Sequence, residues 1–374
     1  MPRSPVGMIR RTARVVRRVL ADPASYARDT GRPSTDHPRV GLVGFYGWGN
    51  YGDELFLETL TSSLGPDVDI QSLVGPPWAH VPPLRRGVLG SDVVVIGGGD
   101  LLRPWAMTRY WRPILLRRPV FVAGLGIPMW GGTTPSVVNR LRRFFGHPNL
   151  RGIATRDEGS AAWIRDNLDP KVPVRVTPDL VCSLDLPTVQ RPAGPPIFGV
   201  AVRRRDVPDD LTHVRRLCEK AVSMGYRLRR IILATGRVRQ NDIEATAGLG
   251  FEDTEMISSD DLDDISRAIG ECTVMATMKF HGVVVATMYG VTPIAMMPTT
   301  KTRNFITDIG RPDLLTHFAH DDLPDHLRPE MPPIDQGVRD RLRNGSAEYL
   351  RDLRADILTT AAGGYRPAGS AERG

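Results

Sequence analysis

Two series of short apolar runs, each run followed by a turn and then by a helical pattern, constrain the fold of this chain more than any other feature. Runs such as VVVI at 93–96 and VFVAGLGI at 120–127 are almost continuously apolar. Strands that are covered on both faces have this composition, whereas half-exposed strands alternate apolar and polar residues. The pattern therefore predicts parallel sheets in α/β domains.

The first series predicts six strands and the second predicts five. The expected strands are Arg39–Phe45, Val68–Val74, Asp92–Ile96, Val120–Leu125, Gly152–Thr155 and Val174–Val176, then Ile197–Val202, Leu228–Ala234, Glu255–Ile257, Cys272–Thr277 and Thr292–Met297. Helical patterns lie at 53–64, 106–117, 135–145, 158–167, 209–224, 239–248, 261–269 and 282–289. We expect two doubly wound, Rossmann-like domains that face a cleft, as in the GT-B architecture, with ligands at the carboxyl ends of the strands.

Four prolines among residues 186–196 indicate a linker between the two series. The expected segments are a basic arm at 1–38, an N-terminal α/β domain at 39–186, a linker at 187–196, a C-terminal α/β domain at 197–330, a closing helix at 331–360 and a disordered tail at 361–374.

Most of the positive charge lies in the arm. The chain carries +7, and the first 40 residues hold nine Arg against three Asp, which gives +6 there and leaves +1 for the rest. The body is nearly neutral, so the charge does not indicate nucleic-acid binding. Residues 8–20 form a basic amphipathic pattern. We favour a solvated arm, and weak peripheral contact with an anionic membrane is the alternative.

Three cysteines far apart, without a CxxC pair, predict neither a zinc site nor a disulfide framework. The chain has no apolar run of membrane-spanning length, and its first residues lack the apolar core of a secretory signal. We therefore expect a cytoplasmic protein, with the inner face of the cell membrane as the place of any arm contact.

The first expected strand runs into a GxGxxG pattern formed by Gly47, Gly49 and Gly52. This pattern is typical of dinucleotide sites, but Asp53 and Glu54 stand where a helix N-terminus would receive a pyrophosphate. We therefore expect no nicotinamide cofactor. Two interpretations remain for this turn: Asp53 caps the helix, or Asn50 and Asp53 contact a substrate hydroxyl.

Other strand ends carry further candidates. Gly98, Gly99 and Asp100 follow one strand, and Arg156 follows another. Glycines permit close approach of backbone to a ligand, and an Arg at a strand end can point at one. The alternative for the turn after Arg156 is simple helix capping by Asp157.

The segment Lys279-Phe280-His281-Gly282 follows a strand in the second series, and we expect a helix to begin at or near Gly282. Lys301 follows the next strand. A helix N-terminus, two cations and an imidazole at neighbouring strand ends suit an anionic ligand. The alternative is a structural histidine with solvated lysines.

These motifs together, GxGNYGDE, GGGD-LL, TRDEGS and KFHG-VVA-MYGVTP-I followed by Lys, resemble the polysaccharide pyruvyl transferase family over about 40–315. The resemblance implies a GT-B-like fold and transfer of pyruvate from phosphoenolpyruvate onto two hydroxyls of a glycan sugar, giving a cyclic ketal and phosphate. It implies phosphoenolpyruvate as co-substrate without a required nicotinamide. The sequence contains no metal-ligand cluster, so we expect no metal and no separate cofactor. Family members often have Arg-x-His where this chain has Lys279-Phe280-His281.

The resemblance assigns the donor to the C-terminal domain and the acceptor, a glycan or lipid-linked sugar of exopolysaccharide or cell-envelope synthesis, to the N-terminal domain. His281 is the expected catalytic acid–base group, because an imidazole titrates near neutrality. The donor has a carboxylate and a phosphate and therefore needs cations. The expected donor residues are Lys279, Lys301, Arg156, Arg203 and Gly282. The expected acceptor residues are Asn50, Asp53, Gly98, Gly99 and Asp100.

Two other functions stay open. One is a GT-B glycosyltransferase that uses a nucleotide-sugar. Such an enzyme would need a ribose-binding carboxylate, and the stretch GVVVATMYG after His281 contains no acid. The other is a family member without catalytic activity, which acts by binding.

Overall fold

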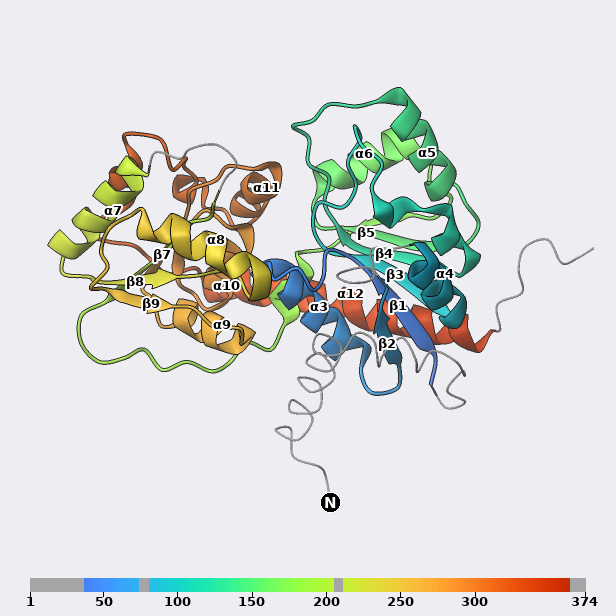
Figure 1. Cartoon of the computed structure of the whole chain (residues 1–374), viewed down its shortest axis with the longest axis horizontal. Helices are drawn as coiled ribbons and strands as arrows, with labels where there is room; N and C mark the ends of the chain where they lie inside the picture. Colours follow the sequence, from blue (N-terminus) through green and yellow to red (C-terminus); the bar gives the residue numbers. More distant parts are fainter. Residues whose placement is uncertain (1–36, 74–80, 205–210, 364–374) are drawn as a thin grey trace, which may run out of the picture. The chain divides into compact units, whose positions relative to one another are not determined.

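The computed structural model describes residues 37–73, 81–204 and 211–363 (Figure 1). The amphipathic pattern at 8–20, nearly all of the basic arm and most of the predicted tail lie outside these residues. The described chain forms two compact units. Of the described residues, unit 1 holds 37–47, 56–73, 81–180 and 347–363, and unit 2 holds 48–55, 181–204 and 211–346.

This division differs from the predicted segments in three places. The boundary lies between Leu180 and Val181, ahead of the predicted linker. Residues 48–55 belong to unit 2, although they sit within the predicted N-terminal domain. The predicted closing helix is divided, because its residues from Ala347 onward pack in unit 1. The cleft that we expected between two domains stays a prediction.

Unit 1 contains a parallel sheet of six strands among the described residues, in the order β2-β1-β3-β4-β5-β6. The strands are β1 (Arg39–Val43), β2 (Asp69–Ser72), β3 (Val93–Gly97), β4 (Val120–Leu125), β5 (Leu150–Thr155) and β6 (Val174–Val176). The described helical elements within unit 1 are α4 (Val81–Gly90), η1 (Arg109–Trp111), η2 (Pro113–Arg117), α5 (Pro135–Phe145) and α6 (Glu158–Leu168). Two elements cross the unit boundary: α3 (Tyr51–Leu64) belongs to unit 1 from Phe56 onward, and η3 (Leu180–Ser183) belongs to unit 2 from Val181 onward.

The central strands β3 and β4 are buried on both faces, as their apolar sequences require. Val94 and Ile96 of β3 pack in one core cluster with α4, α5 and α6. The alternate residues face the other way: a side chain at Gly97 would meet Phe56 and Leu60 of α3. Helix α12 (Gln336–Ala362) also packs in unit 1, where Tyr349 Oη donates to the Val122 carbonyl at 3.5 Å.

Unit 2 contains a second parallel sheet, with five described strands in the order β11-β10-β7-β8-β9. The strands are β7 (Ile197–Ala201), β8 (Arg227–Ile231), β9 (Glu255–Ile257), β10 (Val274–Thr277) and β11 (Thr292–Ala295). The helical elements are α7 (Thr212–Ser223), α8 (Gly236–Ala247), α9 (Leu262–Gly270), α10 (Phe280–Met288), α11 (Thr300–Asp308), η4 (Pro312–Leu314) and η5 (Leu323–His326).

Each sheet reverses its strand order at one place, and in such sheets ligands bind outside the carboxyl ends at that place. In unit 1 the reversal lies between β1 and β3, and in unit 2 it lies between β7 and β10. The predicted Gly-rich turns follow β1 and β3, and Arg203 and Lys279 follow β7 and β10. Both sets of motifs therefore stand at the position that this topology favours for ligands.

All eleven predicted strands are present, with ends that shift by a few residues. The helical pattern at 106–117 is wrong in type, because η1 and η2 form two short 3₁₀ helices there. Helices α4 and α11 were not expected. Two prolines in the first turn of α4 masked its helical pattern, although proline is tolerated at that position.

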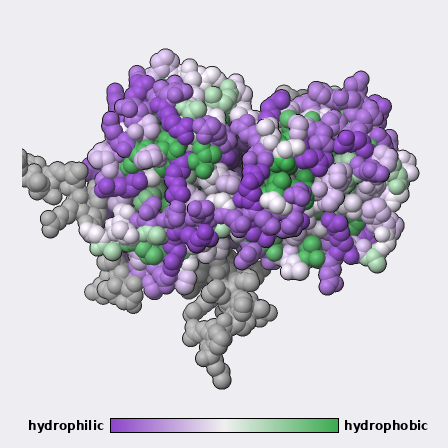
Figure 2. All heavy atoms as spheres, turned by 180° about the vertical axis from the view of Figure 1, so that it is seen from behind, coloured by the Kyte–Doolittle hydropathy of each residue, from purple (hydrophilic) through white to green (hydrophobic). Residues whose placement is uncertain are grey.

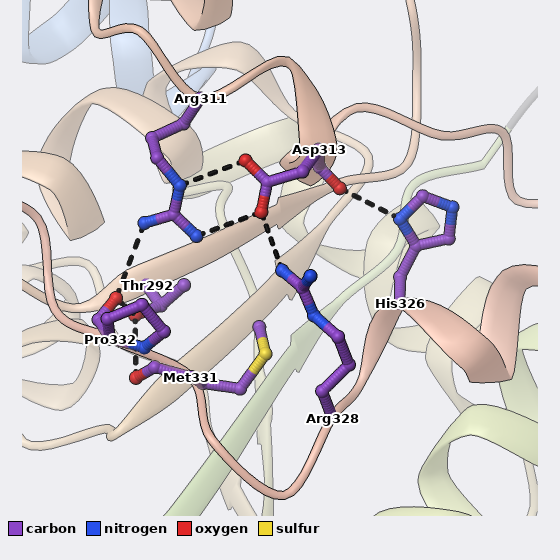
Figure 3. Close-up of polar contacts among 7 residues, drawn as sticks. All are labelled: Thr292, Arg311, Asp313, His326, Arg328, Met331 and Pro332. Carbon is purple, nitrogen blue, oxygen red and sulfur yellow. Dashed lines mark hydrogen bonds and ion pairs between the residues drawn. The ribbon is translucent and has the colours of Figure 1, made fainter.

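The connection between α11 and α12 is held to unit 2 by a cluster around Asp313 (Figure 3). Arg311 donates two hydrogen bonds to the Asp313 carboxylate, at 2.9 and 3.0 Å, and Arg328 donates a third at 2.6 Å. Arg311 also donates to the Pro332 carbonyl at 3.4 Å, and Thr292 of β11 donates to the same carbonyl at 2.8 Å. The cluster therefore fixes an irregular connection to the edge strand of the sheet.

No helix within 37–73, 81–204 and 211–363 combines the length and the apolar character needed to cross a bilayer. On the face drawn in Figure 2, hydrophobic residues form separate patches among hydrophilic ones.

Candidate functional site

His281 lies at the carboxyl end of β10, in the first turn of α10. The helix begins at Phe280 with Lys279 as its N-cap residue, two residues earlier than the sequence predicted. The Gly282 N–H consequently donates to the Lys279 carbonyl at 3.0 Å. A side chain at Gly282 would meet Thr277 at 2.6 Å and Leu233 at 2.7 Å. Gly282 is buried and permits close packing of the helix, and the donor role expected for it stays a prediction.

The Gly-rich turn after β1 reaches the same place in unit 2. The Thr235 N–H donates to the Gly49 carbonyl at 2.7 Å, and Asn50 forms a bridge with Ala234. Gly52 packs directly on the imidazole, since an added Cβ would lie 1.8 Å from His281 Nδ1. Two motifs that are more than two hundred residues apart in the sequence therefore meet at His281.

Asp53 and Glu54 are both buried in the first turn of α3. Asp53 accepts a hydrogen bond from the Asn50 amide, and the Gly49 N–H donates to Glu54 Oε1 at 3.0 Å. In a dinucleotide site the glycine N–H groups would face a pyrophosphate. Here the Glu54 carboxylate of the same turn occupies one of them, and the absence of a nicotinamide cofactor stays a prediction.

Lys279 is engaged in a buried ion pair. Its ammonium lies 2.5 Å from Asp242 Oδ2 of α8 and donates to the Leu233 carbonyl at 2.8 Å. Burial lowers the pKa of Lys279 from its ordinary value, and Arg203 acts in the same direction. The carboxylates of Asp242 and Asp53 act against this lowering. The charge of Lys279 is thus largely compensated by the protein itself.

Two other predicted cations accompany the histidine in unit 2. Arg203 follows β7, is exposed, and is close enough for its charge to affect Lys279. Lys301 lies in the first turn of α11 with its ammonium 5.5 Å from the Phe280 ring centroid. The Phe280 ring packs edge-on against His281, at 5.0 Å between centroids. Lys301 and the imidazole therefore share an aromatic neighbour.

The remaining predicted residues form a separate cluster in unit 1. The Arg156 guanidinium pairs with Asp100 and lies 3.7 Å from Asp179. The Arg156 and Asp179 side chains are buried, whereas Asp100 is 28% exposed. Gly98 and Gly99 have φ of +88° and +70°, and the Gly126 N–H donates to the Gly99 carbonyl at 3.0 Å. The loops after β3, β4 and β5 are thereby joined.

The structure thus groups the predicted donor and acceptor residues into units in another way than the sequence analysis did. Asn50 and Asp53, predicted on the acceptor side, lie with His281 and Lys279 in unit 2. Arg156, predicted at the donor, lies in unit 1 with Gly98, Gly99 and Asp100. The sequence analysis missed Asp242 and Asp179. Asp179 follows the predicted strand at 174–176, which was an available signal, whereas nothing in the helical pattern around Asp242 marked it.

A cavity of about 410 Å³ lies elsewhere in unit 2, beside β9 and α9. Its Arg229 side chain is buried between Glu255 and Glu271, at 2.8 and 2.7 Å. This cavity does not suit an anionic ligand, because carboxylates already surround its buried cation. Within the described residues, no group of His, Cys, Asp and Glu side chains is arranged to hold a metal ion.

Comparison with known proteins decides the family. The family model described as polysaccharide pyruvyl transferase matches residues 45–298, more than half of the chain. The chain belongs to this family. The matched stretch of this pyruvyl transferase family member includes both motifs that meet at His281. It ends before Lys301, so the role of that residue has no support from the match. No curated protein matches the chain in sequence.

Solved structures of low sequence identity share the fold of this family member. A UDP-GlcNAc 2-epimerase from Methanocaldococcus jannaschii is 8% identical with a TM-score of 0.55, covering 85% of this chain and 99% of its own. Another UDP-N-acetylglucosamine 2-epimerase is 11% identical with a TM-score of 0.51, covering 91% and 100%. S. aureus MnaA, in a UDP co-structure, is 12% identical with a TM-score of 0.50, covering 84% and 97%. The fold is GT-B-like, as the sequence predicted.

Proposed function

We propose that this family member transfers pyruvate from phosphoenolpyruvate onto two hydroxyls of a glycan sugar, as a cyclic ketal. The observation that supports this most is the contact between Gly52 and His281, which joins the two motifs of the family match at the strand reversal of unit 2. An imidazole beside cations and a carboxylate suits proton transfer on an anionic donor.

The reaction balances with the donor and acceptor alone. One glycan oxygen bonds to C2 of phosphoenolpyruvate while the methylene carbon takes a proton and becomes a methyl group. The second glycan oxygen forms another bond to C2 as the bond from C2 to the phosphate oxygen breaks. Of the two hydroxyl protons, one ends on the methyl carbon and the other on the released phosphate. His281 is the group that we assign to these proton transfers.

The donor carries a carboxylate and a phosphate, and these anions need positive charge nearby. We assign this role to Arg203 and Lys301, because both accompany His281 in unit 2 and Arg203 is exposed. We reassign Lys279, since its ammonium is paired with Asp242 and Leu233. In this proposal Lys279 holds α8 against the start of α10 and so positions His281. Preorganised charge of this kind is a major source of catalysis.

The test is release of inorganic phosphate from phosphoenolpyruvate on addition of β-galactosides, glucosides or mannosamine glycans. Parallel reactions with UDP- and GDP-sugars test the nucleotide-sugar alternative by release of UDP or GDP. His281→Ala should lower kcat by about 10²–10⁴, the usual range for general acid–base catalysis, with an unchanged melting temperature. A lower melting temperature with wild-type kcat would indicate a structural histidine. Nucleotide release, or no product at all, would overturn the proposal.

A further inference from the structure

A pair of tryptophans stands on the loops of unit 1, outside both clusters described above. Trp130, in the loop after β4, is 76% exposed, the largest exposed fraction among the large hydrophobic side chains of the described residues. Trp105, in the loop after β3, is half-buried beside it. Their ring centroids are 4.6 Å apart, with an interplanar angle of 52°. Two tryptophans in contact form a contiguous apolar surface, and contiguous exposed apolar surface is typical of a binding site, whereas a single exposed residue is not.

The two loops are fixed rather than loose. The Thr134 N–H donates to the Pro104 carbonyl at 2.9 Å, and Thr134 Oγ1 donates to the Trp105 carbonyl at 3.3 Å. The Ile127 N–H donates to Ser160 Oγ at 3.0 Å. A side chain at Gly131 would lie 2.2 Å from the Trp105 ring, so the backbone rests directly on that ring. The aromatic surface is therefore preorganised, which lowers the entropic cost of binding.

The position connects this surface to the buried cluster of unit 1. The Trp130 loop begins at Gly126, where an added side chain would meet the Arg156 guanidinium at 2.4 Å. The Trp105 loop begins just after Asp100, which pairs with Arg156. Both loops follow the carboxyl ends of neighbouring strands, where ligands of doubly wound sheets bind. The pair thus stands at the ligand edge of unit 1.

We propose that Trp105 and Trp130 form a stacking surface for a neutral sugar ring of the acceptor glycan. This inference rests on the proposed function for the assignment of the glycan as acceptor. Sugar rings present C–H groups on their faces, which pack on an indole while the hydroxyls stay in water. Two tilted rings match a single sugar better than they match a bilayer, which needs a wider apolar face. Next to Trp130, Met129 is exposed and apolar, whereas the exposed residues that follow, Gly132 and Thr133, have no large apolar side chain.

The experiment measures binding of a panel of neutral oligosaccharides to the full chain by titration calorimetry, without phosphoenolpyruvate. Trp130→Ala should weaken binding about tenfold or more, as for exposed tryptophans that anchor a ligand, and Trp130→Phe should weaken it less. Leu89→Ala is the matched control, because Leu89 is an exposed apolar residue (44%) of the same unit. It should bind as the wild type does. All variants should keep the wild-type melting temperature.

Equal affinity of Trp130→Ala and wild type, or no glycan binding by the wild type, would overturn the inference. So would loss of binding to phosphatidylglycerol vesicles in Trp130→Ala with glycan binding unchanged, which would assign the surface to a membrane. The proposed function fails separately: Trp130-dependent glycan binding without phosphate release refutes the transferase and leaves the stacking surface. Phosphate release with the same glycan KM in Trp130→Ala refutes the stacking surface and leaves the transferase.

Discussion

The imidazole of His281 owes its position to a residue that has no side chain. Any Cβ at position 52 would overlap the ring, so Gly52 fixes how closely the turn after β1 can approach α10. Glycine is needed here for close approach, since its φ is not among the positive ones. The residue that the GxGxxG pattern offered as a phosphate-binding glycine is instead a packing surface for the histidine.

Gly52→Ala should therefore displace the imidazole. We expect kcat for pyruvyl transfer to fall at least about tenfold, because small misplacements of catalytic groups are costly. Stability should fall by about 1–3 kcal/mol from overpacking. Gly90→Ala is the matched control, since an added Cβ at Gly90 meets nothing within 4 Å. In a double-mutant cycle with His281→Ala the stability cost should largely disappear. An additive cost would contradict the contact.

Lys279 and Asp242 should behave as a structural pair. Lys279→Met leaves the Asp242 carboxylate, whose side chain is 7% exposed, without its cation. Loss of one partner of a buried pair costs about 3–5 kcal/mol, which urea unfolding would measure. Adding Asp242→Leu should restore much of the stability, and the KM for phosphoenolpyruvate should then be close to that of the wild type. A raised donor KM in the stable double variant would return Lys279 to the donor site.

Ion pairs around Asp313 hold the connection between α11 and α12, and they make its contribution to stability depend on pH. Hydrogen bonds from Arg311 and then Arg328 lower the pKa of Asp313 below its ordinary value of 3.8. The unfolded chain therefore binds this proton more tightly than the folded one. The stabilisation is fully present above about pH 4 and is lost as the pH falls through the lower folded pKa.

Asp313→Asn should accordingly lower the melting temperature at pH 7, and the difference from wild type should shrink as the pH falls below 3.8. Thermal scans between about pH 2.5 and 7 measure the difference in melting temperature on both sides of this titration. Asp69→Asn, at an exposed position of β2, is the control and should change the melting temperature little at any pH. A difference that stays constant with pH would refute the assignment.

Helix α12 is an integral part of unit 1 although it comes last in the chain. Its Tyr349, Leu350, Leu353 and Ile357 side chains are buried, and Arg354 donates to the Leu64 carbonyl at 3.0 Å. Burial of four such side chains contributes about 6–12 kcal/mol as an upper estimate, comparable with the whole stability of a domain.

A chain that ends at residue 346 should therefore lose the folded state of unit 1, whereas a chain that ends at 363 should melt as the full chain does. Circular dichroism measures the loss of structure, and limited proteolysis locates it. New cleavage sites should fall within 56–180 in the shorter chain. Protection of this range in the chain that ends at 346 would show that α12 is dispensable.

Across both described units, the sequence predicted what depends on local pattern and missed what depends on distant partners. The continuous apolar runs located the central strands of both described sheets, because burial on both faces leaves a simple signature. The start of α10 lies at Phe280, two residues before the predicted Gly282, and Lys279 has no side-chain cap hydrogen bond that would mark it as the N-cap residue. Asp242 was missed because its partner, Lys279, lies 37 positions further along the sequence. The grouping of Asn50 and Asp53 with His281 could be found only from the folded structure, because no local pattern links these residues.

The basic arm should be dispensable for activity on a water-soluble acceptor. The charge of +6 in the first 40 residues, without a core-forming pattern, predicts that a chain lacking 1–36 remains soluble and active. If the arm contacts anionic membranes, only vesicle binding should fall, and added salt should have the same effect on the full chain. Sedimentation with vesicles and the phosphate assay measure the two properties. Loss of folding in the shortened chain would contradict this.

The eight residues from Trp48 to Leu55 belong to unit 2 while the chain on either side of them belongs to unit 1. The two units are therefore not interchangeable modules. A chimaera made by recombining two relatives at residue 180 would inherit its histidine segment from one parent and the turn that packs on it from the other. Such hybrids should be active only when residues 48–55 and the second half of the sequence come from the same parent. Divergence in one segment thus restricts divergence in the other, and the two should be exchanged together in any effort to recombine acceptor preferences within the family.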